Sequence, residues 1–201
     1  FNFRQQGRLL LPKMRSEPSQ VNEHTAEIAE LIPDLVSEDA GALVLFTSWK
    51  QMLAVLDLVD EDFRARVLCQ GNLSKIEILQ QHKQAIDNAE KSCIFGLASF
   101  SEGVDLPGSY CSHVVIAKIP FSVPDDPVSA TLSELIEARG GNAFYEVMLP
   151  DAAIKMVQAA GRLLRTETDT GCVTILDRRL LTKSYGRILM NALPPFAREI
   201  R

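Results

Sequence analysis

Short, uninterrupted apolar runs alternate along this chain with segments of helical periodicity. The runs lie at residues 8–12, 42–47, 66–70, 92–97, 113–119 and 172–176. A strand with both faces buried shows such a continuous run, whereas a strand with one face in solvent alternates between apolar and polar residues. Strands that alternate with helices at this spacing form βαβ units around a parallel sheet. We therefore predict an α/β fold in which a parallel sheet is flanked by helices.

The segments between the runs carry helix signals. Apolar residues recur at helical spacing over 21–35, where Ser19 is the expected N-cap and Pro33 the expected kink or end. Ser74 and Glu77 are spaced as a capping box, in which each side chain binds the other residue's backbone amide. Further helices are predicted over residues 50–58, 127–139, 151–165 and 180–193. No repeat or long linker interrupts the pattern, so all 201 residues are predicted to form one domain.

Composition and cysteine usage narrow the class of protein. Hydrophobic residues make up 46% of the chain, enough to bury a substantial core. Its apolar runs are far shorter than the roughly 20 residues that a bilayer-spanning helix needs, so we expect a soluble, cytoplasmic protein without membrane contact. The four cysteines lie in or beside apolar stretches without CxxC spacing, which is typical of buried reduced thiols. We expect no metal site within the chain.

Charge is distributed unevenly. The net charge is −5, but residues 151–201 hold nine Lys or Arg and five Asp or Glu, which gives +4 and leaves −9 for residues 1–150. A basic C-terminal quarter on an acidic body suits a localised phosphate or phosphodiester site. An ordinary mixed surface explains the charge pattern equally well.

The strongest candidates for chemistry are Gln158, Arg162 and Arg165 in the predicted helix 151–165. At about 100° per residue, their side chains share an arc of about 60° on that helix. Two fixed guanidinium groups are suited to binding a phosphoryl group. For a bare GRxxR pattern, however, a surface helix with solvated arginines is the simpler explanation.

A polar loop at 99–108 strengthens the functional interpretation. It follows the predicted strand 92–97, and ligands of parallel α/β sheets bind at the carboxyl ends of strands. Glu102, Gly103 and Asp105 would place carboxylates and a backbone amide there. Taken alone, this loop would be an ordinary turn.

Together these segments resemble the DinG/YoaA branch of the XPD-like superfamily 2 DNA helicases. Residues 44–48 resemble helicase motif IV, the loop 101–105 resembles motif V, and the sequence QAAGRLLR at 158–165 matches the QxxGRxxR pattern of motif VI. The segments similar to that branch in particular are 7–18, 118–127, 144–151 and 177–186. The resemblance covers essentially the whole chain, and the choice of DinG over its sibling YoaA depends mainly on the first and last of these segments. It implies a RecA-like fold, the second motor lobe of such a helicase, with a family-typical insertion at about 122–150.

The same resemblance implies a nucleotide site shared with another lobe. The sequence contains no GxxxxGK[ST] P-loop, no DExH box and no cysteine quartet of the type that holds the family's iron–sulfur cluster. ATP and Mg²⁺ are therefore expected between this chain and an N-terminal lobe of the same polypeptide, and the cluster is expected outside this chain. Arg162 and Arg165 are the expected arginine fingers toward the γ-phosphate. The residues expected to couple nucleotide state to closure of the lobes are Gln158, Glu102, Gly103 and Asp105.

Single-stranded DNA is the second expected ligand, moved with 5′ to 3′ polarity as the resemblance implies. A motor that ignores sequence holds phosphates with amides, hydroxyls and cations, and stacks aromatic rings on bases. The expected DNA-binding residues, which follow the predicted strand 42–47, are Thr47, Ser48, Trp49 and Lys50. For Trp49, a place in the core or at the start of a helix is the alternative.

Three functions remain open on the sequence. The leading one is an ATP-dependent 5′ to 3′ DNA helicase in DNA repair or replication, located in the bacterial cytoplasm at the nucleoid, with replication or repair proteins as partners. The same motifs would serve an RNA-directed or translocation-only superfamily 2 motor. A non-catalytic α/β module that binds a replication or repair partner is the third.

Overall fold

A single parallel sheet organises the molecule. The computed structural model describes residues 1–123 and 125–201; Pro124, in the family-like loop 118–127 and the expected insertion, lies outside the described residues. Within the described residues the sheet has seven strands in the order β3-β4-β2-β5-β6-β1-β7, and every pairing is parallel. The strands are β1 (Gly7–Leu11), β2 (Gly41–Phe46), β3 (Val67–Cys69), β4 (Ser92–Leu97), β5 (His113–Ile116), β6 (Gly171–Ile175) and β7 (Ala197–Ile200).

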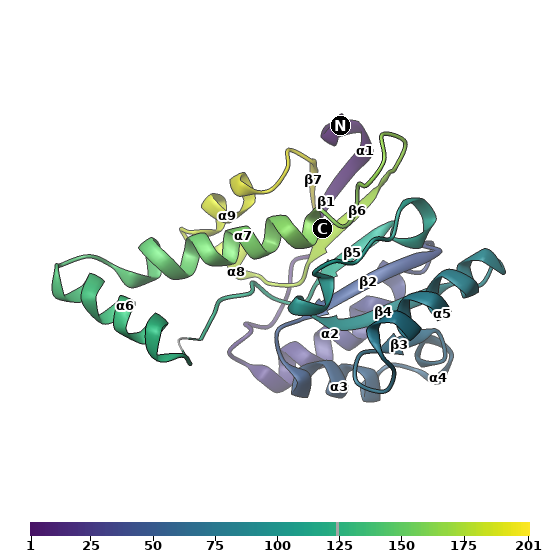
Figure 1. The fold of residues 1–201 in the computed structure, drawn as a ribbon, viewed down its shortest axis with the longest axis horizontal. Helices are drawn as coiled ribbons and strands as arrows, with labels where there is room; N and C mark the ends of the chain where they lie inside the picture. The colour runs from purple at the N-terminus through teal and green to yellow at the C-terminus, as the bar shows by residue number, and fades with distance from the viewer. Residues whose placement is uncertain (124) are drawn as a thin grey trace.

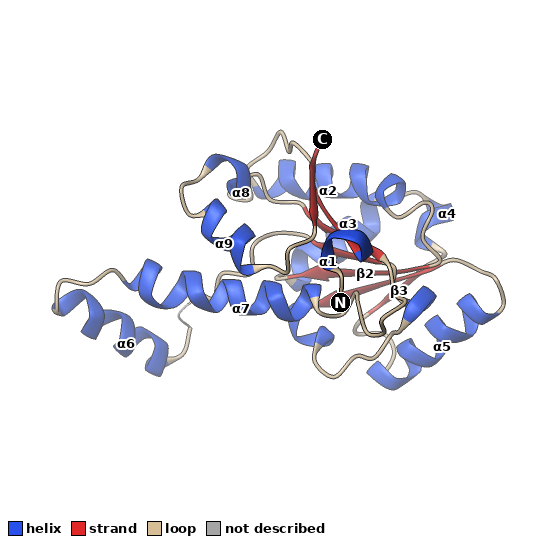
Figure 2. Cartoon of the chain, turned by 90° about the horizontal axis from the view of Figure 1, so that it is seen from above, coloured by secondary structure: helices blue, strands red, loops and turns tan. Residues whose placement is uncertain are grey.

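Helices pack on both faces of this sheet (Figures 1 and 2). The longer helices are α2 (Val21–Leu35), α3 (Trp49–Leu58), α5 (Lys75–Asp87), α6 (Pro127–Ala138), α7 (Leu149–Ala160) and α9 (Gly186–Ala192). The short ones are α1 (Phe3–Gln6), α4 (Glu61–Arg64) and α8 (Arg179–Thr182), and a π-helical turn at Phe144–Met148 precedes α7. No helix in the described part of the chain is long and apolar enough to cross a membrane. The α/β prediction is therefore confirmed.

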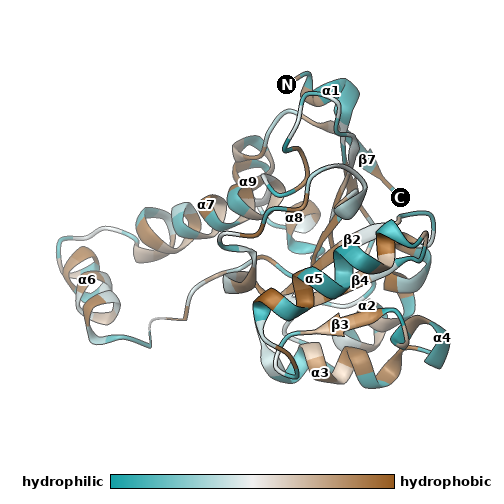
Figure 3. Ribbon diagram, turned by 45° about the vertical axis from the view of Figure 1, so that its right-hand side comes forward, coloured by the Kyte–Doolittle hydropathy of each residue, from teal (hydrophilic) through white to brown (hydrophobic). Residues whose placement is uncertain are grey.

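Strand β2 shows how the two halves of the core form. All six of its residues are buried. Leu43 and Leu45 belong to the cluster that contains α5, α7 and α9 side chains, whereas Val44 and Phe46 belong to the cluster built with α2, α3 and α4. Neighbouring residues of a strand point to opposite faces, so one continuous apolar run fills both halves of the core. Figure 3 shows this hydrophobic character on the strands, with mixed hydrophilic and hydrophobic turns on α5.

The predicted strands are confirmed with small shifts of their ends. The prediction 92–97 matches β4 at both ends, and β5 ends at Ile116 instead of residue 119. Beyond that point the amide of Ile119 donates to the side chain of Asp177, at 2.8 Å from Oδ2, and not to a neighbouring strand. The capping box at Ser74 and Glu77 is also confirmed. Pro33 lies in the last turn of α2, which ends at Leu35.

Three local predictions are wrong. Ser19 does not cap α2, because the helix begins one residue later than such a cap requires: Gln20 is the N-cap position and offers no side-chain hydrogen bond. The helix predicted over 180–193 is broken into α8 and α9, where Gly186 passes so close to Leu180 that a Cβ would lie 2.1 Å from the Leu180 carbonyl oxygen. The helix predicted over 151–165 ends at Ala160.

Candidate functional site

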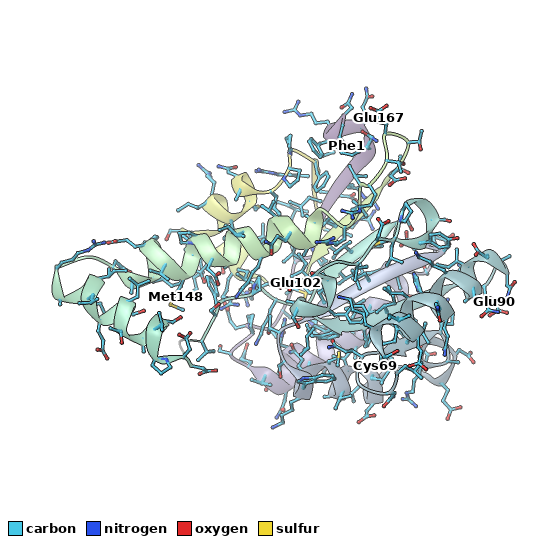
Figure 4. The ribbon with its side chains drawn as sticks, in the orientation of Figure 1. Phe1, Cys69, Glu90, Glu102, Met148 and Glu167 are labelled. Atoms are coloured by element: carbon cyan, nitrogen blue, oxygen red, sulfur yellow. The ribbon has the colours of Figure 1, made fainter. Side chains whose placement is uncertain are left out.

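A groove of ≈ 440 Å³ lies at the carboxyl ends of β2, β4 and β5, beside α7. Its lining includes residues predicted from three separate motifs, namely Thr47, Glu102 and Gln158. Figure 4 shows Glu102 between α7 and the central strands. The further polar lining residues are Ser99, Ser101, Lys118, Ser122, Asp125 and Lys155. The fold thus brings the predicted motif IV, V and VI segments to one edge of the sheet, where parallel α/β proteins bind ligands.

The loop after β4 is anchored by apolar residues that alternate with exposed polar ones. Val104 and Leu106 are each only 1% exposed, whereas Glu102, Gly103 and Asp105 are exposed. Gly103 has a φ of +70° with open space where a Cβ would be, so its backbone can turn the loop at little cost. The three predicted coupling residues are therefore held on the surface by a buried scaffold.

Both predicted arginines contact this loop. Arg162 Nη1 donates to the backbone oxygen of Val104 at 3.0 Å, and Arg165 Nε lies 3.1 Å from Asp105 Oδ1. Gln158 is exposed on α7 and faces the groove. The segments that resemble motifs V and VI are thus joined by direct side-chain contacts.

The arginines lie beyond the helix, which corrects the shared helical arc predicted for them. Helix α7 ends at Ala160, and residues 161–163 form a turn. The cause is Asp169, whose Oδ2 accepts hydrogen bonds from the backbone amides of Arg165 and Thr166, both at 2.8 Å. Burial acts to raise the pKa of Asp169, but the hydrogen bonds from the Thr166 hydroxyl and these amides lower it overall. The backbone at Arg165 is therefore held by a carboxylate four residues further along the chain.

Neither guanidinium is saturated by its protein contacts. Arg162 Nε is buried and has no hydrogen-bond partner in the described residues. The partner of Arg165 is a 69% exposed aspartate side chain, and ion pairs of that kind contribute only about 0–1 kcal/mol. A phosphate oxygen can therefore replace Asp105 at small cost, whereas Arg162 Nε would first have to become exposed to bind one.

In the segment 47–50, one of the four predicted DNA-binding residues has a structural role. Thr47 and Lys50 are exposed, but Ser48 Oγ accepts a hydrogen bond from the Gln51 amide and caps α3. Trp49 begins α3 and is 44% exposed, so it does not belong to the core. Its ring packs beside Gly71, whose Cβ, if present, would lie 3.2 Å from it.

A smaller hollow of ≈ 350 Å³ adjoins Trp49. Lys75 and Phe100 also line it, and the Lys75 ammonium lies 5.1 Å from the centroid of the Phe100 ring while donating to the Glu102 carbonyl oxygen. The sequence interpretation did not single out Lys75, although its position after the Ser74 cap, at the start of a helix, was a usable signal. It also gave no role to Lys118, which it placed near the end of a strand and at the start of the family-like segment 118–127.

The histidines and cysteines of the chain are buried in the fold. His24, His82 and His113 are all at least 98% buried and hydrogen-bonded through both ring nitrogens. The four cysteines, Cys69, Cys93, Cys111 and Cys172, are free and buried, as predicted. Within residues 1–123 and 125–201, no three His, Cys, Asp or Glu side chains are grouped to hold a metal ion.

Comparison with known proteins decides the family. Residues 32–196 match the family model described as the helicase C-terminal domain. The chain belongs to this family. This helicase C-terminal domain is 38% identical over 203 residues to the ATP-dependent DNA helicase DinG of Photobacterium profundum, covering 100% of this chain and 29% of that protein. It is 40% identical to DinG of Escherichia coli K12, covering 99% of this chain and 28% of that protein. The chain spans less than a third of the length of these relatives.

Solved structures give the same fold. A structure of an XPD helicase superposes with a TM-score of 0.70 at 19% identity, covering 98% of this chain and 36% of that one. An apo structure of XPD also gives a TM-score of 0.70 at 22% identity, covering 96% of this chain and 39% of that one. This domain therefore has the RecA-like lobe architecture that the sequence motifs predicted.

Proposed function

We propose that this helicase C-terminal domain is the second motor lobe of an ATP-dependent DNA helicase, and that it supplies arginine fingers and part of the single-stranded DNA path. The observation that carries the proposal is the joint placement of Arg162 and Arg165 against the loop 101–105, whose other side lines the groove. Similarity to two proteins named ATP-dependent DNA helicase DinG supports ATP and DNA as the ligands.

The arginine pair suits phosphoryl transfer. In the transition state of phosphoryl transfer, the γ-phosphate develops charge on its oxygens, and a positioned guanidinium stabilises that charge. Arg162 retains an unpaired Nε, and Arg165 can exchange Asp105 for a phosphate oxygen. In this proposal we assign Mg²⁺ and the iron–sulfur cluster expected from the resemblance, with the phosphate-binding loop, to the rest of the polypeptide.

The loop contacts provide a route for coupling. If Arg165 moves from Asp105 to a nucleotide phosphate, the loop loses one of its two arginine contacts while Val104 stays bound to Arg162. The same loop presents Ser101 and Glu102 to the groove, where Gln158 faces them from α7. Nucleotide state would therefore alter the groove in which DNA is held.

The DNA path in this proposal runs along the groove and past Trp49. Thr47 and Lys50 supply a hydroxyl and a cation, and Trp49 supplies an exposed ring, as binding without sequence preference requires. The expected insertion at about 122–150 borders the path through Ser122. Movement from 5′ to 3′, a role in DNA repair or replication, partner proteins of those processes, and a place in the bacterial cytoplasm at the nucleoid complete the proposal.

Strand separation by the complete polypeptide tests this function. The enzyme should hydrolyse ATP in a manner stimulated by single-stranded DNA, and should unwind DNA duplexes that carry a 5′ tail but not those that carry only a 3′ tail. Preferential unwinding of RNA duplexes would indicate an RNA-directed motor, and ATP hydrolysis without strand separation a translocase. Absence of both ATP hydrolysis and DNA binding would leave a partner-binding module.

A further inference from the structure

Lys118 is a half-buried cation with no protein acceptor. It follows β5 and lines the groove at the carboxyl edge of the sheet. Among the described residues, its ammonium makes no hydrogen bond and no ion pair, whereas Lys155 in the same groove contacts Asp151 at 2.9 Å and Ser122 at 2.5 Å. Burial lowers the pKa of Lys118, and the nearby charge of Arg179 lowers it further. An ammonium group kept partly from water without a counterion is costly, and a bound anion would offset that cost.

Asp177, the carboxylate that acts electrostatically on Lys118, is already committed to other partners. It is 98% buried and accepts hydrogen bonds from Arg179 Nε at 2.9 Å and Arg179 Nη2 at 2.6 Å. It also accepts hydrogen bonds from the backbone amides of Ile119 and Arg179, at 2.8 and 3.0 Å. Because Arg179 compensates Asp177, the Lys118 charge is left for a ligand in the groove.

The surroundings of Lys118 favour a phosphodiester over a nucleotide. Hydroxyl groups of Thr47 and Ser99 line the same groove and can donate hydrogen bonds to phosphate oxygens of a nucleic-acid backbone. Neither Arg162 nor Arg165 lines it, although these are the residues proposed to reach the nucleotide. The arginine pair and Lys118 therefore serve two different phosphates.

We propose that Lys118 anchors one phosphate of the single-stranded nucleic-acid backbone in this groove. The inference rests on the proposed function and adds to it a residue outside the helicase-like motifs IV, V and VI. A single cation in a sequence-independent path contributes electrostatically, so its removal should weaken binding to all sequences alike and reduce the salt dependence of binding.

The test uses Lys118→Met, which keeps the aliphatic stem and removes the charge, in the complete polypeptide. Fluorescence anisotropy with labelled oligo-dT, without nucleotide, gives the association constant across a series of KCl concentrations. The slope of log K against log[KCl] should become shallower by about 0.7, the value for one phosphate contact on a single strand. Affinity for oligo-dT and oligo-dA should fall by similar factors, and Lys118→Arg should restore the slope.

Lys91 provides a matched control, because it precedes β4 at the opposite edge of the sheet and Lys91→Met removes the same charge. Its salt slope should equal that of the wild type. An unchanged slope in Lys118→Met, in an enzyme whose wild type unwinds DNA, overturns the inference alone; a wild type without DNA-stimulated ATP hydrolysis overturns the proposed function instead. A raised KM for ATP in Lys118→Met with unchanged DNA binding would also overturn the inference about Lys118, because it would place a nucleotide phosphate there. A lower melting temperature with an unchanged slope would show a structural role.

Discussion

Arg162 and Arg165 have donors that the protein leaves free or weakly paired, and this is the basis of their proposed catalytic role. We expect Arg162→Ala or Arg165→Ala in the complete polypeptide to lower DNA-stimulated ATP turnover by at least about 10²-fold, a cautious figure beside the 10³ to 10⁵ known for arginine fingers. Affinity for single-stranded DNA without nucleotide should change little. Steady-state phosphate release and anisotropy measure the two effects; lost DNA binding with normal turnover would instead place the arginines on the DNA.

Trp49 is 44% exposed at the start of α3, beside a hollow lined by Lys75 and Phe100. A base stacked on its ring is worth about 1–3 kcal/mol, so Trp49→Ala should weaken oligo-dT binding roughly 5- to 150-fold, and Trp49→Phe should weaken it less. Trp49 is the sole tryptophan of the chain, so its emission should shift on DNA binding once tryptophans elsewhere in the polypeptide are replaced. Unmoved emission, with lower thermal stability but normal affinity for Trp49→Ala, would show that the ring serves only to pack on Gly71.

His113 forms a buried pair with Asp39. Burial opposes its protonation, but the hydrogen bond from Nδ1 to Asp39 Oδ2 at 2.8 Å, the neighbouring Cys172 and the charge of Asp39 together outweigh this effect and raise the pKa of His113 to about 9. The folded state therefore holds a proton that the unfolded state releases near pH 6.5, so this stabilisation is complete below pH 6.5 and is lost as pH rises through 9. We expect the free energy of unfolding to fall by roughly 2–3 kcal/mol from this pair.

Urea denaturation of the chain at pH 6.5, 8 and 9.5 measures that fall. In His113→Gln the part of the pH dependence that belongs to the pair should disappear, so the wild type and the variant should differ most at pH 6.5. A difference between them that is constant over this pH range would contradict a protonated His113.

Among the elements, the end of α7 has the clearest functional consequence. Helical periodicity continues past Ala160 in the sequence, but Asp169 takes the amides of Arg165 and Thr166 and turns the chain toward the loop 101–105. Gln6 donates to the backbone oxygen of Asp169 at 3.0 Å, which ties the turn to the N-terminal segment. The turn that carries Arg165 is thus held both by Asp169 and by a contact with a distant part of the chain.

Asp169→Asn should therefore disturb both stability and turnover. The amide keeps the size of the carboxylate but loses an acceptor, and we expect a destabilisation of about 1–3 kcal/mol, as for other hydrogen bonds to charged groups. ATP turnover in the complete polypeptide should fall as Arg165 loses its position. Glu167→Gln makes the same charge change at an exposed site of the same turn and should stay within about ±0.5 kcal/mol. Equal effects of the two substitutions would show that only charge matters here.

At the scale of the whole molecule, the proposed function gives the chain only one side of a nucleotide site. It carries the arginine pair and the groove but no P-loop. The isolated chain with ATP, Mg²⁺ and single-stranded DNA should release phosphate at the background rate, because the groups that wrap the β- and γ-phosphates are absent from it. Turnover that persists through repurification, and is lost in an Arg165→Ala chain, would show a complete site within these residues.

The sequence by itself determined the layered fold and the family. Continuous runs such as 42–47 and 92–97 define buried parallel strands because burial of both faces requires apolar residues at every position. The order of the motif-like segments, ending with QAAGRLLR at 158–165, was enough to predict the family later confirmed over residues 32–196. Each of these signals is local, since it is carried by consecutive residues.

Tertiary structure alone decided what depends on distant partners. Strand β7, with Arg198 and Glu199, has no apolar run and forms only because β1 offers it an edge. Arg162 reaches the Val104 carbonyl and Arg165 reaches Asp105 across 58 and 60 residues of sequence. The Lys118 segment likewise meets Asp177 through the Ile119 amide, which is 58 residues away in the sequence. Local periodicity cannot report such effects, because hydrogen bonds and charges act between residues that are close in space but separated in the sequence.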